Sequence, residues 1–253
     1  RGLGLALLEY FAQHSNEWMV IATARNVDTL PKLPNVLALP LDLSIPVHND
    51  HLIQLLINHQ HQQQQQVQPP GEVMNFFSAE LKINLLIHNA GFHPKDRSPD
   101  YLQSTMYIKD FSSSSVMNCC MVNALGPMEL TGKLLRHELL ATPDENLTVL
   151  AISSWLGSIS QKSFAGHYGY AGSKALLNMC MKGLALEFCK IAPHWTAVAL
   201  NPGWMSTDMG GNTAEFNPRQ VAAAIYAMVQ DQAFIQSKNG KFVNVMDRTE
   251  HPW

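Results

Sequence analysis

The chain has 253 residues, of which 46% are apolar and 15% charged, and its formal net charge is −3 at neutral pH. This profile fits one large folded domain and excludes a disordered or collagen-like chain. The small acidic charge offers no broad basic surface for nucleic acid or an anionic membrane, and the longest apolar runs fall far short of the roughly 20 residues of a membrane helix.

Short apolar runs alternate with longer helical patterns along the chain. The runs predict strands at residues 17–25, 36–42, 83–89, 147–154, 196–201 and 241–245. The helical patterns lie at residues 3–14, 48–59, 113–140, 170–191 and 218–230. Most of the runs are apolar at consecutive positions, which is typical of strands covered on both faces. We therefore predict an α/β fold in which residues 1–253 form a single Rossmann-type domain, a doubly wound parallel sheet flanked by helices.

Residues 59–70, which read HQHQQQQQVQPP, interrupt this pattern. Glutamine-rich, low-complexity sequence is typical of a disordered surface insertion. His59 and His61 could bind a metal, but histidines beside a polyglutamine run are far more often part of a solvated loop. We assign this segment no function and predict no metal.

The first candidate ligand-binding motif is Arg1-Gly2-Leu3-Gly4, directly before a helical pattern. Glycines before a helix let the backbone approach a pyrophosphate, and the helix N-terminus supplies free N–H groups. An ordinary turn can contain the same glycines, so the motif depends on support from elsewhere.

That support comes from Thr23-Ala24-Arg25 at the end of the next strand. An NAD-binding domain usually has a carboxylate here for the ribose 2′-hydroxyl, whereas a cation suits a 2′-phosphate. Arg25 therefore indicates NADP, and Arg1 could add a second cation on the same phosphate. Either arginine could instead be a solvated surface residue.

Two further strands end in small or polar residues, at Asp42-Leu43 and at Asn89-Ala90-Gly91. The carboxyl ends of parallel strands meet at one edge of the sheet, where ligands bind. We expect Asp42 to accept a hydrogen bond from the adenine amino group. Ala90 and Gly91 would let the cofactor pass close to the backbone.

The strongest chemical signal is Tyr170-Ala171-Gly172-Ser173-Lys174, with Ser154 and Asn123 before it. A helix places Tyr170 and Lys174 on one face, because they are four residues apart. A free tyrosine has a pKa of about 10, and a neighbouring ammonium favours the phenolate, so Tyr170 becomes a candidate acid and base. Ser154 could hydrogen-bond a substrate oxygen that gains charge, and Asn123 could hold a water that relays protons to Lys174.

These residues in this order, with Asn201-Pro202-Gly203 after the next strand, resemble the short-chain dehydrogenase/reductase family across essentially the whole chain. Residues 201–211, 240–242 and 251–253 are similar to its C-factor and sniffer carbonyl reductase branch. The resemblance implies reduction of a small-molecule carbonyl compound by NADPH.

It also implies roles for individual residues. Tyr170 would donate the proton, Ser154 would bind the substrate oxygen, and Lys174 would bind the nicotinamide ribose. Asn123 would complete the catalytic set, and Thr207 would bind the nicotinamide carboxamide. The expected cofactor contacts are Arg1, Gly2, Leu3, Gly4, Arg25, Asp42, Leu43, Asn89, Ala90, Gly91, Tyr170, Lys174, Pro202, Gly203 and Thr207.

Three features of the sequence depart from the family pattern, and one of them is the glutamine-rich insertion, which we expect to lie away from the site. Members carry a first strand that ends in T-G-x-x-x-G-x-G, whereas this sequence starts just before the second glycine. We therefore expect the first strand to be missing from this chain, which would expose sheet edges. His88 stands where the family usually has an asparagine, and its protonation would perturb the sheet locally.

Residues 204–216 are rich in Trp, Met and Gly, which fits a partly apolar lid over a small or flat carbonyl compound, or a simple cap on the sheet. Residues 175–188 are nearly all apolar, as expected for a buried helix. In many relatives the corresponding helix forms a dimer interface, so a homodimer is a second interpretation of that pattern.

Alternative functions include a nucleotide-binding signalling or regulatory protein of the same fold and a Rossmann-type methyltransferase. The complete set of Asn123, Ser154, Tyr170 and Lys174 favours the enzyme, because a pure binder needs no proton-transfer group. A methyltransferase leaves the Tyr170 and Lys174 pair unexplained. The four cysteines lack the spacing of a zinc site or a secreted disulfide framework, so we expect reduced thiols and a cytoplasmic protein.

Overall fold

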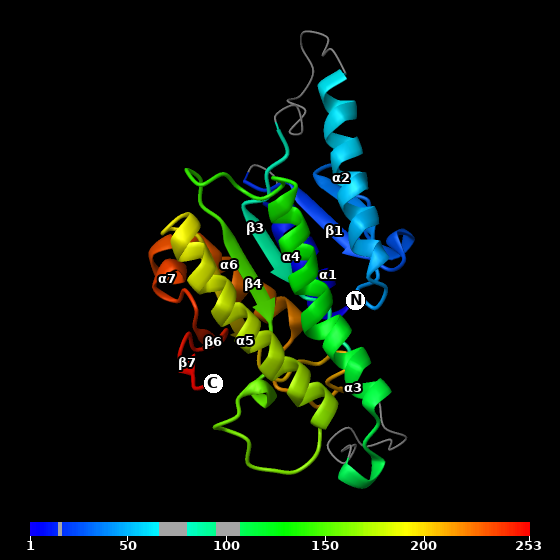
Figure 1. Ribbon diagram of the computed structural model, residues 1–253, viewed down its shortest axis with the longest axis vertical. Coiled ribbons are helices and arrows are strands. Elements are labelled where there is room, and N and C mark those ends of the chain that lie inside the picture. The colour runs from blue at the N-terminus through cyan, green and yellow to red at the C-terminus, as the bar shows by residue number, and fades with distance from the viewer. Residues whose placement is uncertain (15–16, 66–79, 95–106) are drawn as a thin grey trace.

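A computed structural model describes residues 1–14, 17–65, 80–94 and 107–253. Its strands are β1 (Val20–Ala24), β2 (Val36–Pro40), β3 (Leu85–His88), β4 (Thr148–Ile152), β5 (Thr196–Asn201), β6 (Phe242–Asn244) and β7 (Glu250–His251). Its α-helices are α1 (Gly2–Gln13), α2 (Val47–Gln65), α3 (Ser113–Cys120), α4 (Gly126–Arg136), α5 (Tyr168–Ile191), α6 (Pro218–Gln230) and α7 (Gln232–Ser237). The predicted alternation of strands and helices is confirmed (Figure 1).

The strands form two separate sheets. Strands β3, β4, β5 and β6 are parallel neighbours in that order, β7 pairs antiparallel with β6, and β1 pairs only with β2. Within the described residues, no strand pairs with both β1 and β3. All residues of β4 and β5 are buried, whereas β1 is only partly so, because a strand at an open sheet edge lacks a neighbour on one side.

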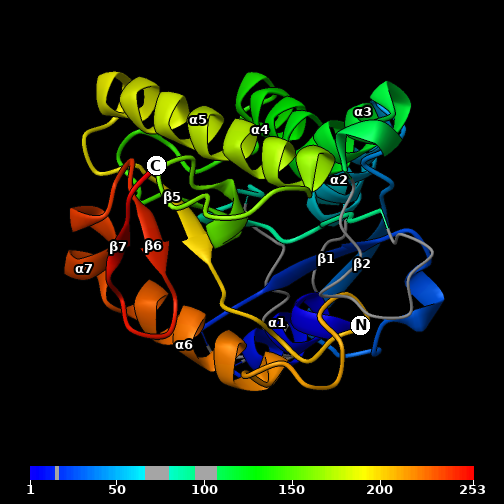
Figure 2. The same ribbon diagram turned by 90° about the horizontal axis from the view of Figure 1, so that it is seen from below.

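Helices cover both faces of the sheet, as a doubly wound fold requires. Figure 2 shows α1 and α6 on one side and α3, α4 and α5 on the other. Leu177, Met181 and Phe188 of α5 pack into the core on the α5 side. Fully burying a side chain of this size contributes about 1.5–3 kcal/mol, so this packing anchors α5 against the sheet. In the described ranges, none of the helices combines the length and apolar character needed to cross a bilayer.

Our prediction for the first part of the glutamine-rich stretch was wrong. We expected a helix to end at residue 59 and a disordered insertion to follow, but α2 continues to Gln65. Glutamine is a good helix former, and the first proline after this helix comes only at Pro69. Residues 66–70 of the predicted insertion lie outside the described residues.

The single helix predicted over residues 113–140 is also wrong in detail. It is divided into α3, a π-helical turn at Met121–Leu125, and α4, which ends at Arg136. Pro127 has no N–H to give to the carbonyl of Asn123, four residues earlier, so a regular α-helix cannot pass through this point. The irregular turn lies beside the site described next.

Candidate active site

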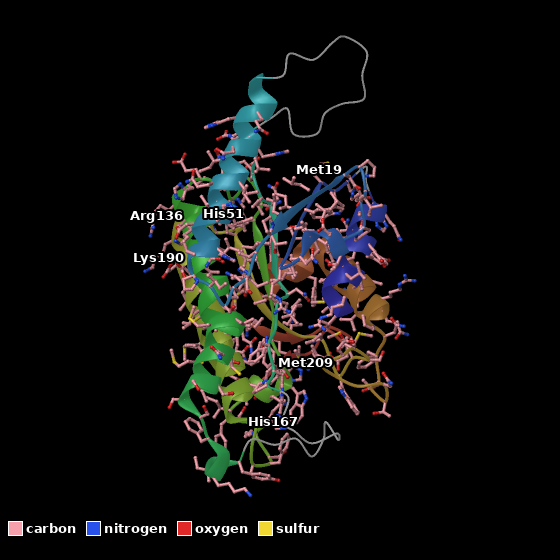
Figure 3. The ribbon with its side chains drawn as sticks, turned by 90° about the vertical axis from the view of Figure 1, so that its right-hand side faces the viewer. Met19, His51, Arg136, His167, Lys190 and Met209 are labelled. Carbon is pink, nitrogen blue, oxygen red and sulfur yellow. The ribbon has the colours of Figure 1, made fainter. Side chains whose placement is uncertain are left out.

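A cavity of about 880 Å³ opens where the parallel strands end. Figure 3 shows His167 and Met209 toward this end of the molecule, with Met19, just before β1, at the opposite end. The cavity is lined by every predicted site residue except Asn123: Arg1, Gly2, Leu3, Gly4, Arg25, Asp42, Leu43, Asn89, Ala90, Gly91, Ser154, Tyr170, Lys174, Pro202, Gly203 and Thr207. Residues far apart in the sequence thus share one site.

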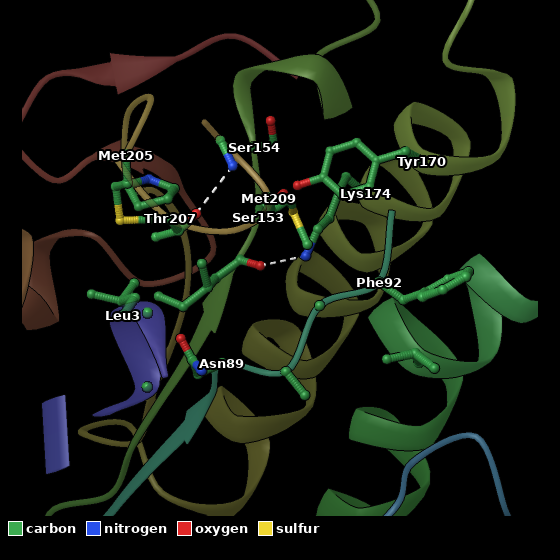
Figure 4. A pocket seen from close by; sticks show the side chains of 18 of the residues that line it. Leu3, Asn89, Phe92, Ser153, Ser154, Tyr170, Lys174, Met205, Thr207 and Met209 are labelled. Carbon is green, nitrogen blue, oxygen red and sulfur yellow. Dashed lines mark hydrogen bonds between the residues drawn. The ribbon is translucent and has the colours of Figure 1, made fainter. Parts of the chain in front are cut away.

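Tyr170 and Lys174 project from α5 into this cavity, with Leu3 and Thr207 across from them (Figure 4). The ammonium of Lys174 lies 5.8 Å from the centre of the Tyr170 ring. Its Nζ donates a hydrogen bond of 2.6 Å to the carbonyl oxygen of Ile152, the last residue of β4. Burial lowers the pKa of Lys174 to about 8, because an ammonium loses hydration inside the protein.

Ser154 starts a tight turn that packs against α5. Its Oγ accepts a hydrogen bond from the N–H of Leu156, which caps the 3-10 turn Trp155–Gly157. A Cβ at Gly157 would lie 2.8 Å from the backbone carbon of Lys174. Only glycine lets this turn approach the helix so closely, so Ser154 reaches the same cavity wall as Lys174.

Asn123 lies behind the cavity wall and is almost completely buried. Its Oδ1 accepts from the N–H of Phe92 at 2.6 Å, and its Nδ2 donates to the carbonyl of Phe92 at 2.9 Å and to Oγ of Ser173 at 2.8 Å. The hydroxyl of Ser173 donates in turn to the carbonyl of Tyr170. The Asn123 side chain therefore ties the loop after β3 to α5, while its part in a proton relay stays a prediction.

The N-terminus of α1 forms another wall. Gly2 has φ +57°, a left-handed conformation that glycine adopts without strain, and a Cβ at Gly4 would lie 2.5 Å from Nδ2 of Asn89. Gly4 thus keeps the helix start close to the loop after β3, whereas Gly2 faces Thr207 in the loop after β5. We expected Arg1 near a 2′-phosphate, but its guanidinium donates to Asp208 at 2.7 Å, in the loop after β5.

The end of β1 and the end of β2 bring Arg25 and Asp42 to one rim. Arg25 is exposed there, and Asp42 accepts hydrogen bonds from the backbone N–H and the hydroxyl of Ser44. The Ser44 hydroxyl, with smaller contributions from Arg25 and His48, lowers the pKa of Asp42. A cation and a carboxylate are therefore available at this rim.

His88 at the end of β3 is buried and neutral. The hydroxyl of Thr131 donates to the carbonyl of Pro127, so Nε2–H of His88 donates to that hydroxyl oxygen at 2.7 Å. Burial lowers the pKa of His88 to about 4. The local perturbation that we expected from its protonation is thus confined to acid pH.

Sequence reasoning missed the aromatic part of the cavity wall. Phe92, Trp155, Phe164 and His167 line it, although they come from three separate segments.

His167 is also hydrogen-bonded to a second histidine, His93. Nδ1 of His93 donates to the carbonyl of Pro94, so Nε2 of His93 accepts from Nδ1 of His167 at 3.1 Å. Burial above all lowers the pKa of His167 to about 4. In the sequence, the one hint of a place in the site was that His167 lies three residues before Tyr170.

Comparison with known proteins places this site in context. The model of the short chain dehydrogenase family matches residues 1–218. The C-signal protein of Myxococcus xanthus is 29% identical over 177 residues, which cover 68% of this chain and 93% of that protein. A short-chain dehydrogenase of Neurospora crassa is 27% identical over 181 residues, covering 68% of this chain and 65% of that protein.

Solved structures have the same fold. The carbonyl reductase Sniffer of Drosophila melanogaster matches with a TM-score of 0.75 and 23% identity, over 100% of this chain and 96% of that one. A carbonyl reductase from Pseudomonas aeruginosa in complex with NADP matches with a TM-score of 0.71 and 23% identity, over 100% and 95%. The predicted similarity to the C-factor and sniffer branch agrees with the matches to C-signal and to Sniffer.

Proposed function

Because this chain belongs to the short-chain dehydrogenase family, we propose that it is an oxidoreductase that uses NADPH to reduce a carbonyl compound to an alcohol. One observation carries the proposal: a buried lysine ammonium, a tyrosine and a serine line one cavity at the carboxyl ends of parallel strands. A protein that only binds nucleotides has no need of that combination.

The cavity fits a nicotinamide dinucleotide. Gly4 leaves no room for a Cβ between α1 and Asn89, so backbone N–H groups at the helix start lie open to a pyrophosphate. Arg25 at the far rim would bind the 2′-phosphate of NADP, and Thr207 and Gly203 would face the nicotinamide end. When bound, NADPH would supply the hydride.

The chain's own residues would supply the proton and hold the carbonyl. The hydroxyls of Ser154 and Tyr170 would donate hydrogen bonds to the carbonyl oxygen, which gains negative charge during reduction. Tyr170 would then release its proton to that oxygen. The ammonium of Lys174 would stabilise the phenolate that remains, and its bond to Ile152 keeps it in place.

The wall of the cavity favours a flat, partly aromatic substrate. Phe92, Trp155 and Phe164 line the end next to Tyr170 and His167, and each is at least a third exposed. Aromatic faces bind flat apolar groups by stacking. We propose quinones and aromatic aldehydes or ketones as the substrate class.

A second candidate is a signalling or regulatory protein that binds the same nucleotide. The match to a protein named C-signal is the observation that favours it. The two candidates differ in whether the biological effect needs the hydroxyl of Tyr170.

We further propose that two copies associate through the outer faces of α4 and α5, which lie side by side in Figure 2. Met179 and Leu186 are 71% and 58% exposed, and because they are seven residues apart they lie on the same face of α5. Sedimentation should show a dimer, and Met179→Lys with Leu186→Lys should give a monomer.

The free thiols of the four cysteines support a reducing compartment, and we propose that the protein is cytoplasmic.

The reaction is tested by following NADPH oxidation with a panel of quinones, aldehydes and ketones, with Ser154→Ala measured in parallel. We expect turnover that falls by roughly 100-fold in Ser154→Ala, which removes one donor to the carbonyl oxygen. Binding of NADPH without turnover of any panel member would contradict the enzyme and favour the signalling protein.

The cofactor preference depends on Arg25. Arg25→Asp replaces the cation at the rim with a carboxylate, which repels a 2′-phosphate and accepts from a 2′-hydroxyl. We expect the ratio of kcat/KM for NADPH over NADH to fall at least tenfold and to reverse, a change of about 1.4 kcal/mol or more. Arg219→Asp, at an exposed arginine on α6 that does not line the cavity, is the control. An unchanged ratio would show that the phosphate binds elsewhere.

A further inference from the structure

Asn201, the last residue of β5, joins two backbone segments of the cavity wall. Its Oδ1 accepts from the N–H of Trp155 at 3.2 Å and from the N–H of Gly203 at 3.3 Å. The first N–H belongs to the peptide directly after Ser154, and the second to the peptide between Pro202 and Gly203. One buried oxygen therefore fixes both segments, while Asn201 itself is not among the residues that line the cavity.

The hydrogen bonds determine which way the Asn201 amide points. Both backbone partners are donors, so the atom that faces them must be the oxygen. Nδ2 then faces Nε2 of His251, 2.8 Å away on β7. Because Nδ2 can only donate, Nε2 of His251 is the acceptor, and the ring proton sits on Nδ1. Nδ1 donates to Oε1 of Gln161 at 3.2 Å, which completes the chain of bonds.

The segment around His251 is held against the Ser154 loop by further contacts. The hydroxyl of Ser158 donates to the carbonyl of Pro252 at 2.7 Å, and the N–H of Ser160 donates to the carbonyl of Trp253 at 3.1 Å. The His251 ring lies 4.9 Å from the ring of Phe242 on β6. These contacts leave the imidazole little freedom to move away from Asn201.

We propose that Asn201 is a positioning residue for the Ser154 turn and for the Pro202–Gly203 turn, and that His251 holds the Asn201 amide in the required orientation. The effect on turnover rests on the proposed reductase function, whereas the effect on the two backbone segments does not. Neither side chain needs to touch substrate or cofactor for this role.

Protonation of His251 would break the arrangement. Nε2 would become a donor facing the donor Nδ2, and rotating the amide would turn Nδ2 toward two backbone N–H groups. The ring is surrounded by Phe242, Gln161 and Asn201, which are uncharged, and by the carboxylate of Asp247 in the turn between β6 and β7. Burial lowers the pKa of His251 and Asp247 opposes this more weakly, so the network is intact at neutral pH.

Three variants separate this role from simple stability. His251→Gln can supply an acceptor to Asn201 but cannot be protonated, and His251→Phe keeps a ring against Phe242 but has no acceptor. Glu250→Gln is the matched control on the same strand, because it removes only the ion pairs with Lys238 and Lys241 at the surface. Hydrogen exchange of individual amides by NMR is the main readout, and kcat and KM with a quinone are the second.

In His251→Phe we expect the amides of Trp155 and Gly203 to exchange at least about tenfold faster, because their shared acceptor is no longer held. The amide of Ser153, which donates to the carbonyl of Leu200, should keep its protection. We expect kcat to fall by about tenfold or more, because a small misplacement near the reacting groups is amplified in the rate. His251→Gln and Glu250→Gln should resemble the wild type at pH 7.

Acidification provides a second, independent test of the proposal that needs no destabilised variant. As His251 becomes protonated on acidification, which its own imidazole NMR signals report, the Trp155 and Gly203 amides should lose protection in the wild type but not at the same pH in His251→Gln, after correction for the intrinsic exchange rate. Equal loss in both proteins, or unchanged protection in His251→Phe, would overturn the proposal. The expected exchange pattern without wild-type turnover would support the positioning network and contradict the reductase.

Discussion

At the scale of single residues, the buried ammonium of Lys174 lowers the stability of the folded protein but is needed for the proposed reaction. Burial holds its pKa at about 8, whereas lysine in an unfolded chain titrates at 10.5. Between these values the unfolded state binds more protons, so the free energy of unfolding rises with pH. Below pH 8 the folded protein carries the full penalty of a buried ammonium, which is tolerated where the charge is needed beside Tyr170.

Lys174→Met should remove that pH dependence together with the reaction. The wild type should gain up to roughly 3 kcal/mol in free energy of unfolding between pH 8 and 10.5 relative to the variant, because 1 pKa unit corresponds to about 1.4 kcal/mol. NADPH oxidation by the variant should fall by at least about 100-fold, since the phenolate loses its ammonium. Denaturant titrations at several pH values check the first result. Parallel stability curves for the two proteins would show that Lys174 is not buried as a charge.

The sequence was sufficient to locate Tyr170 and Lys174, because they are four residues apart on a helix, and Ser154, because it directly follows a predicted strand. It could not reveal that Asn123 binds the backbone of Phe92, or that Asn201 binds Trp155 and His251. Those partners come together only through the tertiary fold, and no local pattern predicts them.

At the scale of elements, the turn Trp155–Gly157 and helix α5 must fit closely for Ser154 and Tyr170 to share a wall. In Gly157→Ala the new methyl would meet helix backbone at Lys174, which cannot yield as a flexible side chain can. We expect a lower Tm and a fall in kcat of roughly 10- to 100-fold, because Ser154 is displaced. Gly183→Ala on the same helix, where a Cβ meets nothing within 4 Å, is the control.

That control should raise stability by about 0.5–1 kcal/mol and leave kcat unchanged, since alanine favours a helix more than glycine. Thermal unfolding and steady-state kinetics of both variants decide the outcome. A Gly157→Ala protein with wild-type kcat would show that the turn and the helix need not be in such close contact.

Element positions were predictable from the sequence, but several boundaries were not. The runs of apolar residues predicted β4 and β5 because both are buried on both faces. Strand β7 was missed, since two polar residues give no alternation or apolar run. The π-helical turn before Pro127 was missed because the apolar pattern continues through it.

At the scale of the whole molecule, buried neutral histidines make the fold sensitive to acid. His88 has a folded pKa of about 4 against 6.5 in an unfolded chain. As pH falls from 6.5 to 4 the unfolded state takes up a proton that the folded state does not, so stability falls. His167 has a lowered pKa of about 4 for the same main reason and acts in the same direction.

His88→Asn should therefore lessen the loss of stability in acid. Between pH 7 and 4 the variant should lose up to roughly 3 kcal/mol less free energy of unfolding than the wild type. His51→Asn, at an exposed histidine on α2 labelled in Figure 3, is the control. Urea titrations across this pH range measure the difference, and an acid loss that is the same in wild type and His88→Asn would refute the assignment.

The division of the sheet into a β1–β2 pair and a β3–β7 sheet is also a property of the whole molecule. We did not predict this division, because apolar runs indicate strands without stating which ones are neighbours; the family resemblance led us to expect only exposed sheet edges. The cavity spans both groups, with Arg25 and Asp42 on one side of the division and Ser154 and Lys174 on the other.

In the proposed reaction, the phenol of Tyr170 delivers a proton to a carbonyl oxygen beside bound NADPH. Tyr170→Phe tests it most directly, by steady-state reduction of a quinone and by NADPH binding from fluorescence on the same preparation. We expect kcat to fall by at least about 100-fold, with the Kd for NADPH within about threefold of the wild type. Reduction that continues at the wild-type rate without this hydroxyl would contradict it.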